Sequence, residues 1–272
     1  MVVQHNMQAV NTNRMLGTNV KAVAKATEKL SSGYAVNRAA DDAAGLSISE
    51  KMRNQIRGIN QAVKNSEDGV SLIQTAEGNM NEIHSILQRM GELATKAAND
   101  VNATEDRTAI ADEMTELREE INSIASKAAF NGTKLLTGSF TSKYLQVGAN
   151  SGENMKISIS SMTATKLGLT ADKIKVSTHA LASSSMTAIS KAIKDVSAAR
   201  SKLGAIQNRL DYTINNLNNY SENLTSAESQ IRDTDMASEM TNYTKNNILQ
   251  QAAQSMLAQA NQSTQGVLSL LG

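Results

Sequence analysis

Cysteine and proline are both absent from the 272 residues of this chain. Without cysteine the chain forms neither a disulfide framework nor a thiolate metal site. Without proline nothing forces a helix to break, because proline removes a helical hydrogen bond and clashes with the preceding turn. The lack of proline favours long uninterrupted helices, whereas the lack of cysteine does not by itself locate the protein.

Aromatic side chains are scarce as well, with five tyrosines, two phenylalanines and no tryptophan. A compact globular core of this size normally uses more of them. Alanine, isoleucine, leucine, valine and methionine must therefore do the packing, which favours close seams between helices.

An excess of charge of one sign is also lacking, since the formal net charge is +1 and the pI is near 7.9. This balance gives no electrostatic argument for binding nucleic acid or a membrane surface. No apolar stretch approaches the ~18–20 residues of a transmembrane helix, and the N-terminus lacks the pattern of a Sec-type signal peptide. Composition alone suggests a cytoplasmic protein without nucleic-acid or membrane partners.

The first 34 residues carry apolar side chains in steps of four and three, with one slip near Arg14. This spacing predicts a helix with a narrow coiled-coil stripe, which is marginal alone and needs a partner. The stripe consists of Val3, Met7, Val10, Leu16, Val20, Val23, Thr27, Leu30 and Tyr34.

Two further helices are predicted, from about 47 to 99 and from Thr104, a plausible cap, to a turn at 130–132. Ser47 and Glu50 have the spacing of a capping box, which would start the first of them at Ser47. Its glycines each weaken it by about 1 kcal/mol relative to alanine, and we attribute them to close approach of a neighbouring helix. These glycines are Gly58, Gly69, Gly78 and Gly91.

The middle of the chain reads as two short strands, 143–147 and 155–160, around a glycine-rich loop, with one more strand expected at 173–176. Helical spacing then returns from 186 to 231 in strict steps of four and three. After a joint at 232–235, a final stripe consists of Leu249, Ala253, Met256, Ala260, Ser263, Val267 and Leu270.

The order of elements is therefore palindromic: short stripe, long helices, strands, long helix, short stripe. The simplest fold pairs the ends with each other. We predict a mainly α protein, an elongated antiparallel helical hairpin or coiled-coil rod with paired termini. A small β-hairpin at about 143–160 is expected at its distal end.

No constellation of residues points to catalysis. The three histidines, His5, His84 and His179, lie far apart and lack an HExxH motif or acidic companions, so neither a metal nor a cofactor is expected. No phosphate-binding loop and no GxSxG motif is present. Asp41 and Asp42 are better explained as a solvated joint or an intersubunit polar contact than as an acid/base pair.

Three stretches resemble bacterial flagellin: 30–46 (LSSGYAVNRAADDAAGL), 231–240 (IRDTDMASEM) and 256–262 (MLAQANQ). The resemblance covers roughly 1–165 and 185–272. It implies an inner core domain from 1–42 and 235–272, and an outer core rod from 43–234. The large variable outer domain of many flagellins is missing.

The resemblance also implies a function as the subunit that polymerises into the extracellular flagellar filament for motility. The implied partners are other copies of the chain, the flagellar type III export apparatus, an export chaperone, and the filament cap and junction proteins. Export would occur without cleavage of a signal. The alternatives are a related hook–filament junction protein and an unrelated coiled-coil adaptor or enzyme module.

One segment, 87–93, resembles the flagellin segment recognised by host Toll-like receptor 5. By this resemblance Arg89 and Leu93 match residues of the epitope, and Glu113 matches its acidic partner. Gly91 stands where the family commonly has a second arginine, whose charge is lost here.

Both terminal stripes bury too little to offset the entropy of ordering some 30 residues, at roughly 1–2 kcal/mol each. We therefore expect them to fold when the subunits assemble, with Met256 in a buried seam. The residues expected to carry assembly are Val20, Val23, Leu30, Asn37, Arg38, Asp41, Asp42, Leu249, Met256, Val267 and Leu270.

Overall fold

The structure is a computed structural model that describes residues 6–271, with side chains as far as residue 263. Helices dominate this part of the chain, and two short antiparallel strand pairs accompany them, which confirms the predicted mainly α class. The elements are α1 (Met7–Ser32), α2 (Ala43–Ala97), α3 (Thr104–Lys127), β1 (Ala129–Phe130), β2 (Thr133–Lys134), β3 (Lys143–Gln146), β4 (Asn154–Ile157), α4 (His179–Arg232) and α5 (Met236–Leu271).

The chain forms two compact units, each with its own packing. The first, called the terminal unit below, consists of Met1–Gln55 and Glu222–Gly272. The second, called the central unit, consists of Ile56–Ser221. The domain boundaries implied by the family resemblance, at 42/43 and 234/235, stay a prediction.

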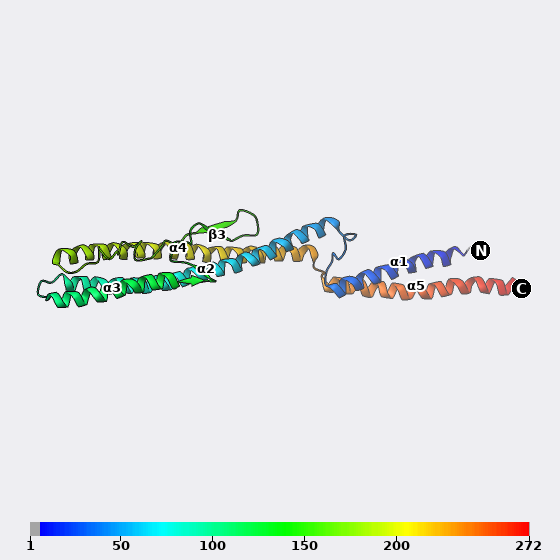
Figure 1. Cartoon of the computed structure of the whole chain (residues 1–272). Coiled ribbons are helices and arrows are strands. Elements are labelled where there is room, and N and C mark those ends of the chain that lie inside the picture. Colours follow the sequence, from blue (N-terminus) through cyan, green and yellow to red (C-terminus); the bar gives the residue numbers. More distant parts are fainter. Residues whose placement is uncertain (1–5, 272) are drawn as a thin grey trace. The chain divides into compact units, whose positions relative to one another are not determined.

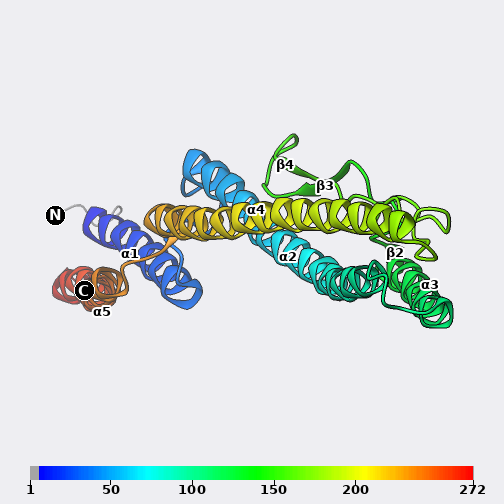
Figure 2. The same ribbon diagram turned by 90° about the vertical axis from the view of Figure 1, so that its left-hand side faces the viewer.

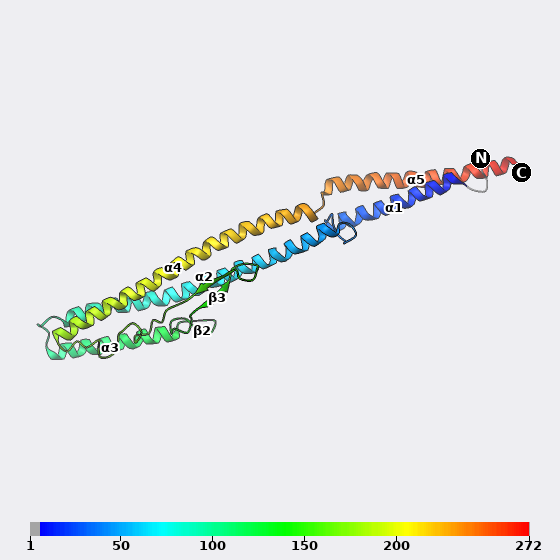
Figure 3. The same cartoon turned by 90° about the horizontal axis from the view of Figure 1, so that it is seen from above.

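In the terminal unit, α1 and α5 lie side by side in antiparallel directions, as Figures 1 and 3 show. Near one end, the side-chain amide of Asn6 donates to the carbonyl of Ala260 at 2.9 Å and also caps α1 by accepting from the amide of Ala9. Near the other end, Tyr34 and Asp233 form an antiparallel bridge. The predicted pairing of the two chain ends is confirmed.

The seam between α1 and α5 agrees with the predicted stripes at Leu16, Val23, Leu30, Ala253 and Ala260, and differs from them at other positions. On α1 it follows Ala9, Leu16, Val23, Ala26 and Leu30, which are half-buried or buried. The predicted seam positions Met7, Val10, Val20, Leu249 and Met256 are wrong, because their side chains are 42–70% exposed. The matching seam of α5 follows Ala253, Leu257 and Ala260, whereas the side chains of Val267 and Leu270 lie outside the described residues.

The ends of α1 and α2 also correct the sequence analysis. Gly33 ends α1 with a left-handed φ of 76°, a conformation that glycine adopts without strain. Helix α2 begins at Ala43, and the carboxylate of Asp42 accepts from the amides of Ala44 and Gly45 at 3.0 and 2.9 Å. The capping box predicted at Ser47 is therefore wrong, because Asp42 supplies the cap one turn earlier.

In the central unit, α2, α3 and α4 surround one core. Figure 2 shows these three helices from the left-hand end of Figure 1. Its largest fully buried side chains are aliphatic or methionine, as the shortage of aromatics predicted. They include Ile73, Met80, Ile83, Leu87, Met90, Met114, Ile121, Leu135, Leu136, Ile159 and Leu169.

The predicted hairpin at 143–160 is present as β3 and β4, with Lys143 opposite Ile157 and Gln146 opposite Asn154. The hairpin lies against the middle of α2, where Ala149 is close to Gly58 and Leu145 is close to Gly69, and not at the turn that follows α2. A second hairpin, β1–β2, was missed by the sequence analysis. Its two turn residues, Asn131 and Gly132, have φ angles of 46° and 75°, as a tight hairpin turn requires.

The strand predicted at 173–176 is wrong, since these residues form a turn and irregular backbone. Ile174 and Val176 nevertheless point into the core and are at most 5% exposed. The buried hydroxyl of Ser185 lies 3.0 and 2.9 Å from the carbonyls of Lys173 and Lys175. The same hydroxyl lies 3.0 Å from the carbonyl of Leu181, so its single proton is shared among three acceptors and ties this irregular segment to α4 without a neighbouring strand.

Candidate functional site

Asp41 fixes the conformation of the loop between α1 and α2. One of its carboxylate oxygens accepts from the amides of Asn37 and Arg38 at 3.3 and 3.1 Å, and the other lies 2.9 Å from the ammonium of Lys25 on α1. The bond to Lys25, followed by the Arg38 amide, lowers the pKa of Asp41 to about 2. Asp41 therefore holds the loop onto α1 as a permanently ionised carboxylate at neutral pH.

The remaining predicted residues of this loop also make local contacts. The side-chain amide of Asn37 donates to the hydroxyl of Ser32 at 2.7 Å, and the guanidinium of Arg38 donates to Glu28 at 2.8 Å. Arg38 is 73% exposed and Asp42 caps α2. The structure thus brings Asn37, Arg38, Asp41 and Asp42 together in one loop, and their role between subunits stays a prediction.

The joint between α4 and α5 is bonded to this loop. The amide of Thr234 donates to the carbonyl of Gly33 at 2.9 Å, and the amide of Ala35 donates to the carbonyl of Arg232 at 2.7 Å. The guanidinium of Arg232 lies 4.6 Å from the centre of the Tyr34 ring and 3.0 Å from Glu50. Sequence analysis placed this joint correctly, with Arg232 in it, but did not predict the contacts of Arg232, because its partners Tyr34 and Glu50 are far away along the chain.

The helix pair formed by α1 and α5 leaves large apolar side chains exposed to solvent. Among its described side chains only Ala26 and Ala260 are fully buried. Nine others on the same two helices are 42–70% exposed, and we call them the open apolar residues. They are Met7, Val10, Met15, Val20, Met236, Met240, Ile248, Leu249 and Met256.

The residues assigned to receptor binding lie in the central unit, on α2 and α3. Arg89 donates through two nitrogens to one carboxylate oxygen of Glu113, at 3.1 and 2.9 Å, and through a third to Glu92 at 3.2 Å. Hydrogen bonding to Glu113, then to Glu92, raises the pKa of Arg89 above its ordinary value. These side chains border an open groove of about 520 Å³, whereas Leu93 is only 4% exposed at its base.

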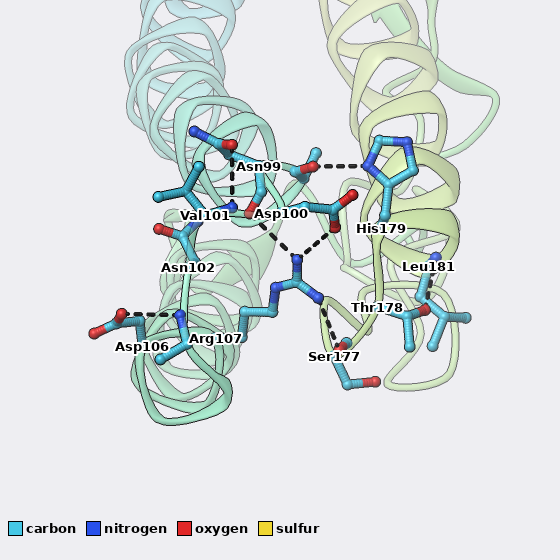
Figure 4. A network of polar contacts seen from close by, with 12 residues as sticks. Asn99, Asp100, Val101, Asn102, Asp106, Arg107, Ser177, Thr178, His179 and Leu181 are labelled. Atoms are coloured by element: carbon cyan, nitrogen blue, oxygen red, sulfur yellow. Dashed lines mark hydrogen bonds and ion pairs between the residues drawn. The ribbon is translucent and has the colours of Figure 1, made fainter.

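Arg107 was not singled out from the sequence, yet it organises one end of the central unit (Figure 4). Its guanidinium donates to the carbonyl of Asn99 at 3.2 Å, the carboxylate of Asp100 at 2.9 Å and the carbonyl of Ser177 at 3.4 Å. Beside it, Nδ1 of His179 lies 2.7 Å from the carbonyl of Ala98 and must therefore donate. A single arginine in a helical stretch gives no sequence signal for this role.

The described residues offer no group of three histidine, aspartate or glutamate side chains that could hold a metal ion. In the same part of the chain, no helix combines the length and the apolar character needed to cross a membrane. What the structure presents is a helical protein with apolar side chains open on its paired terminal helices. These features are typical of structural proteins that associate with further copies.

Two family models identify the class. The model of the bacterial flagellin N-terminal helical region matches residues 3–141, and that of the bacterial flagellin C-terminal helical region matches residues 186–271. The chain therefore belongs to the bacterial flagellin family. Members of this family are structural subunits of the flagellar filament and not enzymes, which confirms the expected class of function.

The sequence of this chain is similar to those of individual flagellins over their whole length. The chain is 52% identical to a flagellin of Halalkalibacterium halodurans, 47% to a flagellin of Bacillus subtilis, and 45% to the flagellar filament 31.3 kDa core protein of Treponema maltophilum. Each comparison covers all of both chains. The first alignment spans 271 residues, so that relative shares the short form without a variable domain.

Two solved structures are similar in fold. The crystal structure of Bacillus cereus flagellin has a TM-score of 0.51 and 30% identity, over 57% of this chain and 88% of its own. A putative flagellar hook-associated protein from Vibrio parahaemolyticus has a TM-score of 0.60 at 16% identity, over 71% of this chain and all of its own. The fold alone therefore does not separate filament subunits from hook-associated proteins, whereas the sequence does.

Proposed function

We propose that this chain builds a motility filament outside the cell by associating through the open apolar residues of α1 and α5. The observation that carries this proposal is the contrast within the terminal unit. Only two alanines are fully buried among the described side chains of the pair, while nine large apolar side chains stay in water. A helix pair of this kind lacks a core of its own and gains one from neighbouring subunits.

The magnitudes are consistent with a cooperative polymer. Covering the exposed half of such a side chain contributes roughly 0.8–1.5 kcal/mol, so nine contribute on the order of 7–14 kcal/mol. Association costs an estimated ~4–15 kcal/mol in lost freedom of motion. A single contact that covers part of this surface is therefore weak, and stability requires several neighbours for each subunit. Contacts between unlike faces that do not close into a ring produce a filament.

The test is a charge placed among the open apolar residues. Met256→Glu introduces a carboxylate at a position that neighbours would bury, where an unpaired charge is very costly. We expect this variant to keep its helical circular dichroism and to lose sedimentation after seeding. Met256→Leu, which keeps size and apolar character, is the control and should pellet like the parent. Pelleting of the glutamate variant at the parental yield would contradict the proposal.

Electron microscopy of the same pellets separates the two flagellar alternatives. A filament subunit gives long filaments, whereas a hook–filament junction protein gives short assemblies or none. The high identity to flagellins along the whole chain supports the first of these. A parent that forms only short caps would favour the junction protein instead.

Coupling of folding to assembly is the second part of the proposal. Because the α1–α5 pair buries so little, its helices should exchange amide protons quickly in the free subunit and slowly in the filament. Hydrogen exchange on both samples tests this directly. Terminal helices that resist exchange equally in both states would show that assembly does not order them.

Export and its partners are proposed on the family resemblance. The chain would leave the cell through the flagellar type III export apparatus with an export chaperone, and join cap and junction proteins at the filament ends. A fusion of residues 1–30 to a non-flagellar reporter tests the export signal in a flagellated host. A reporter that stays inside the cell would count against this proposal.

A second candidate function is recognition by Toll-like receptor 5, supported by the pairing of Arg89 with Glu113. Their side chains are 54% and 45% exposed beside the groove, so a partner can reach both. Leu93, by contrast, lies too deep for a broad contact and supports the groove from below. The proposed recognition surface thus consists of Arg89 and Glu113, with Leu93 as its packing support.

Receptor binding of the free subunit tests this surface. Arg89→Ala should weaken binding, while Gly91→Arg should leave it unchanged or strengthen it, because a Cβ at Gly91 meets only Ile189 at an ordinary 3.8 Å. Ser85→Ala, at an exposed position one turn earlier on α2, serves as the control. Undiminished binding of Arg89→Ala would show that the surface has been misplaced.

A further inference from the structure

The methionines of this chain are divided sharply between the two units. Five are buried in the central unit, with exposures of at most 7%: Met80, Met90, Met114, Met155 and Met162. Five others lie on α1 and α5 in the terminal unit with exposures of 48–70%, and we call them the open methionines. They are Met7, Met15, Met236, Met240 and Met256.

This division has a chemical consequence. The chain contains no cysteine, so a peroxide finds no thiol in it and methionine sulfur is the most readily oxidised group. Oxidation requires access of the oxidant to the sulfur, which the open methionines provide and the buried ones do not. Met52 and Met186 are intermediate, and Met1 lies outside the described residues.

We propose that the open methionines are reversible oxidation sites at which peroxide switches off assembly of the free subunit. The thioether sulfur attacks one oxygen of hydrogen peroxide, a sulfur–oxygen bond forms and the oxygen–oxygen bond breaks. After proton transfer, water leaves. The sulfur loses two electrons to the peroxide, and the product is methionine sulfoxide, which is polar and chiral.

The effect on assembly follows from the position of these residues, and this step rests on the proposed function. The open methionines make up five of the nine open apolar residues. A sulfoxide there must be buried against a neighbouring subunit without an assured hydrogen-bond partner, and burial of such a polar group is unfavourable. In the finished filament the same sulfurs are covered, so oxidation acts on the subunit before incorporation.

The folded subunit itself should survive the modification. The sulfoxides point away from the α1–α5 seam, which follows alanine, leucine and valine side chains. The core of the central unit keeps its five methionines in the reduced form. Oxidised subunits should therefore retain their helical circular dichroism while losing assembly, and this separates the proposed switch from general oxidative unfolding.

The first experiment maps the modification without any variant. Free subunits are treated with hydrogen peroxide until about half of the open methionines are oxidised, and are then seeded and centrifuged. Peptide mass spectrometry should find sulfoxide at the open methionines before the buried ones, and should find it depleted in the pellet relative to the supernatant. Equal sulfoxide fractions in both would overturn the proposal, as would oxidation of Met80, Met90 and Met114 at the same rate.

The second experiment tests the cause. In the fivefold variant M7L, M15L, M236L, M240L and M256L, leucine keeps the apolar character and the helix propensity at each position. The treated variant should pellet like its untreated form, whereas the treated parent should not. Treatment of the oxidised parent with both methionine sulfoxide reductases, one for each sulfoxide epimer, and with a dithiol as the two-electron reductant should restore pelleting, since the sulfoxide oxygen leaves as water.

The outcomes distinguish this inference from the proposed function. Equal inhibition of the parent and the fivefold variant, or no recovery after complete reduction, would overturn the oxidation switch and leave filament assembly intact. An untreated parent that never pellets would contradict the proposed function and this inference with it. If the fivefold variant does not assemble even untreated, the first experiment decides whether oxidation blocks assembly, because it compares the sulfoxide fractions of pellet and supernatant in the natural sequence.

Discussion

The ammonium of Lys25 and the carboxylate of Asp41 lie 2.9 Å apart and join helix α1 to the loop that follows it. The same carboxylate also accepts two backbone amides of its own loop, from Asn37 and Arg38. One side chain therefore sets both the shape of the loop and its position on the helix. Asn37 and Arg38 of the stretch that resembles flagellin are thus both bonded to Asp41, whereas Asp42 caps α2.

This relationship predicts an unusual titration. The pKa of Asp41 is about 2, below its ordinary value of 3.8, so the ionised form stabilises the folded loop fully above pH 3.8. This stabilisation is lost as the pH falls through about 2. NMR titration of the Asp41 carboxyl should show the low value, and Lys25→Met should raise it toward the ordinary one.

Lys21→Met is the matched control, because Lys21 is an exposed lysine one turn earlier on α1. It should leave the titration of Asp41 unchanged. Equal shifts in the two lysine variants would mean that Lys25 acts through general charge and not through its ion pair.

The start of α2 can be tested by two alanine substitutions. Asp42→Ala removes the cap that accepts from Ala44 and Gly45, and should lower the free energy of unfolding by about 1 kcal/mol. Ser47→Ala changes an exposed side chain inside the helix and should stay within about 0.5 kcal/mol of the parent. Urea unfolding measures both. A larger effect at Ser47 would mean that the helix starts there after all.

Two glycines of α2 should respond to alanine in opposite ways. An added Cβ at Gly58 would lie 2.9 Å from the Cβ of Ala149, in the loop of the β3–β4 hairpin. At Gly78 nothing lies within 4 Å. We expect Gly78→Ala to stabilise the protein by about 1 kcal/mol, and Gly58→Ala to displace the loop at a cost of about 1–3 kcal/mol.

Hydrogen exchange of residues 148–153 identifies the displaced loop, and urea unfolding gives the two changes in stability. Faster exchange in the Gly58 variant alone is the expected pattern. If both variants are equally stabilised, the loop yields freely and the close approach does not constrain it.

The arginine network shown in Figure 4 provides a further test. Arg107→Lys keeps the charge but loses the planar fork that reaches Asn99, Asp100 and Ser177, and should cost about 2 kcal/mol. Asp100→Asn removes only an exposed ion-pair partner and should cost no more than about 1 kcal/mol. Thermal unfolding compares them. Equal losses would show that the two carbonyl bonds of Arg107 contribute nothing measurable.

The sequence by itself determined which segments are helical apart from the first turns of α2 and α4, where the joint at 232–235 falls, and that the two chain ends pair. Each of these follows from local information: a repeated spacing of apolar residues, the absence of proline, and polar residues grouped at a joint. The β3–β4 hairpin was predictable for the same reason, since two short strands flank a glycine-rich loop. The family motifs lie within these segments and identified the class of protein.

The tertiary structure alone decided which side of each terminal helix faces its partner. In α1 a row that includes Ala9 and Ala26 and a row of larger residues such as Met7 and Val10 both recur at helical spacing. The predicted stripe mixed these rows, since Leu16, Val23 and Leu30 lie on the seam and Met7, Val10 and Val20 do not. The seam takes in Ala9 and Ala26, because small side chains let two helices approach closely. The larger residues remain on the open side, where further copies of the chain can cover them.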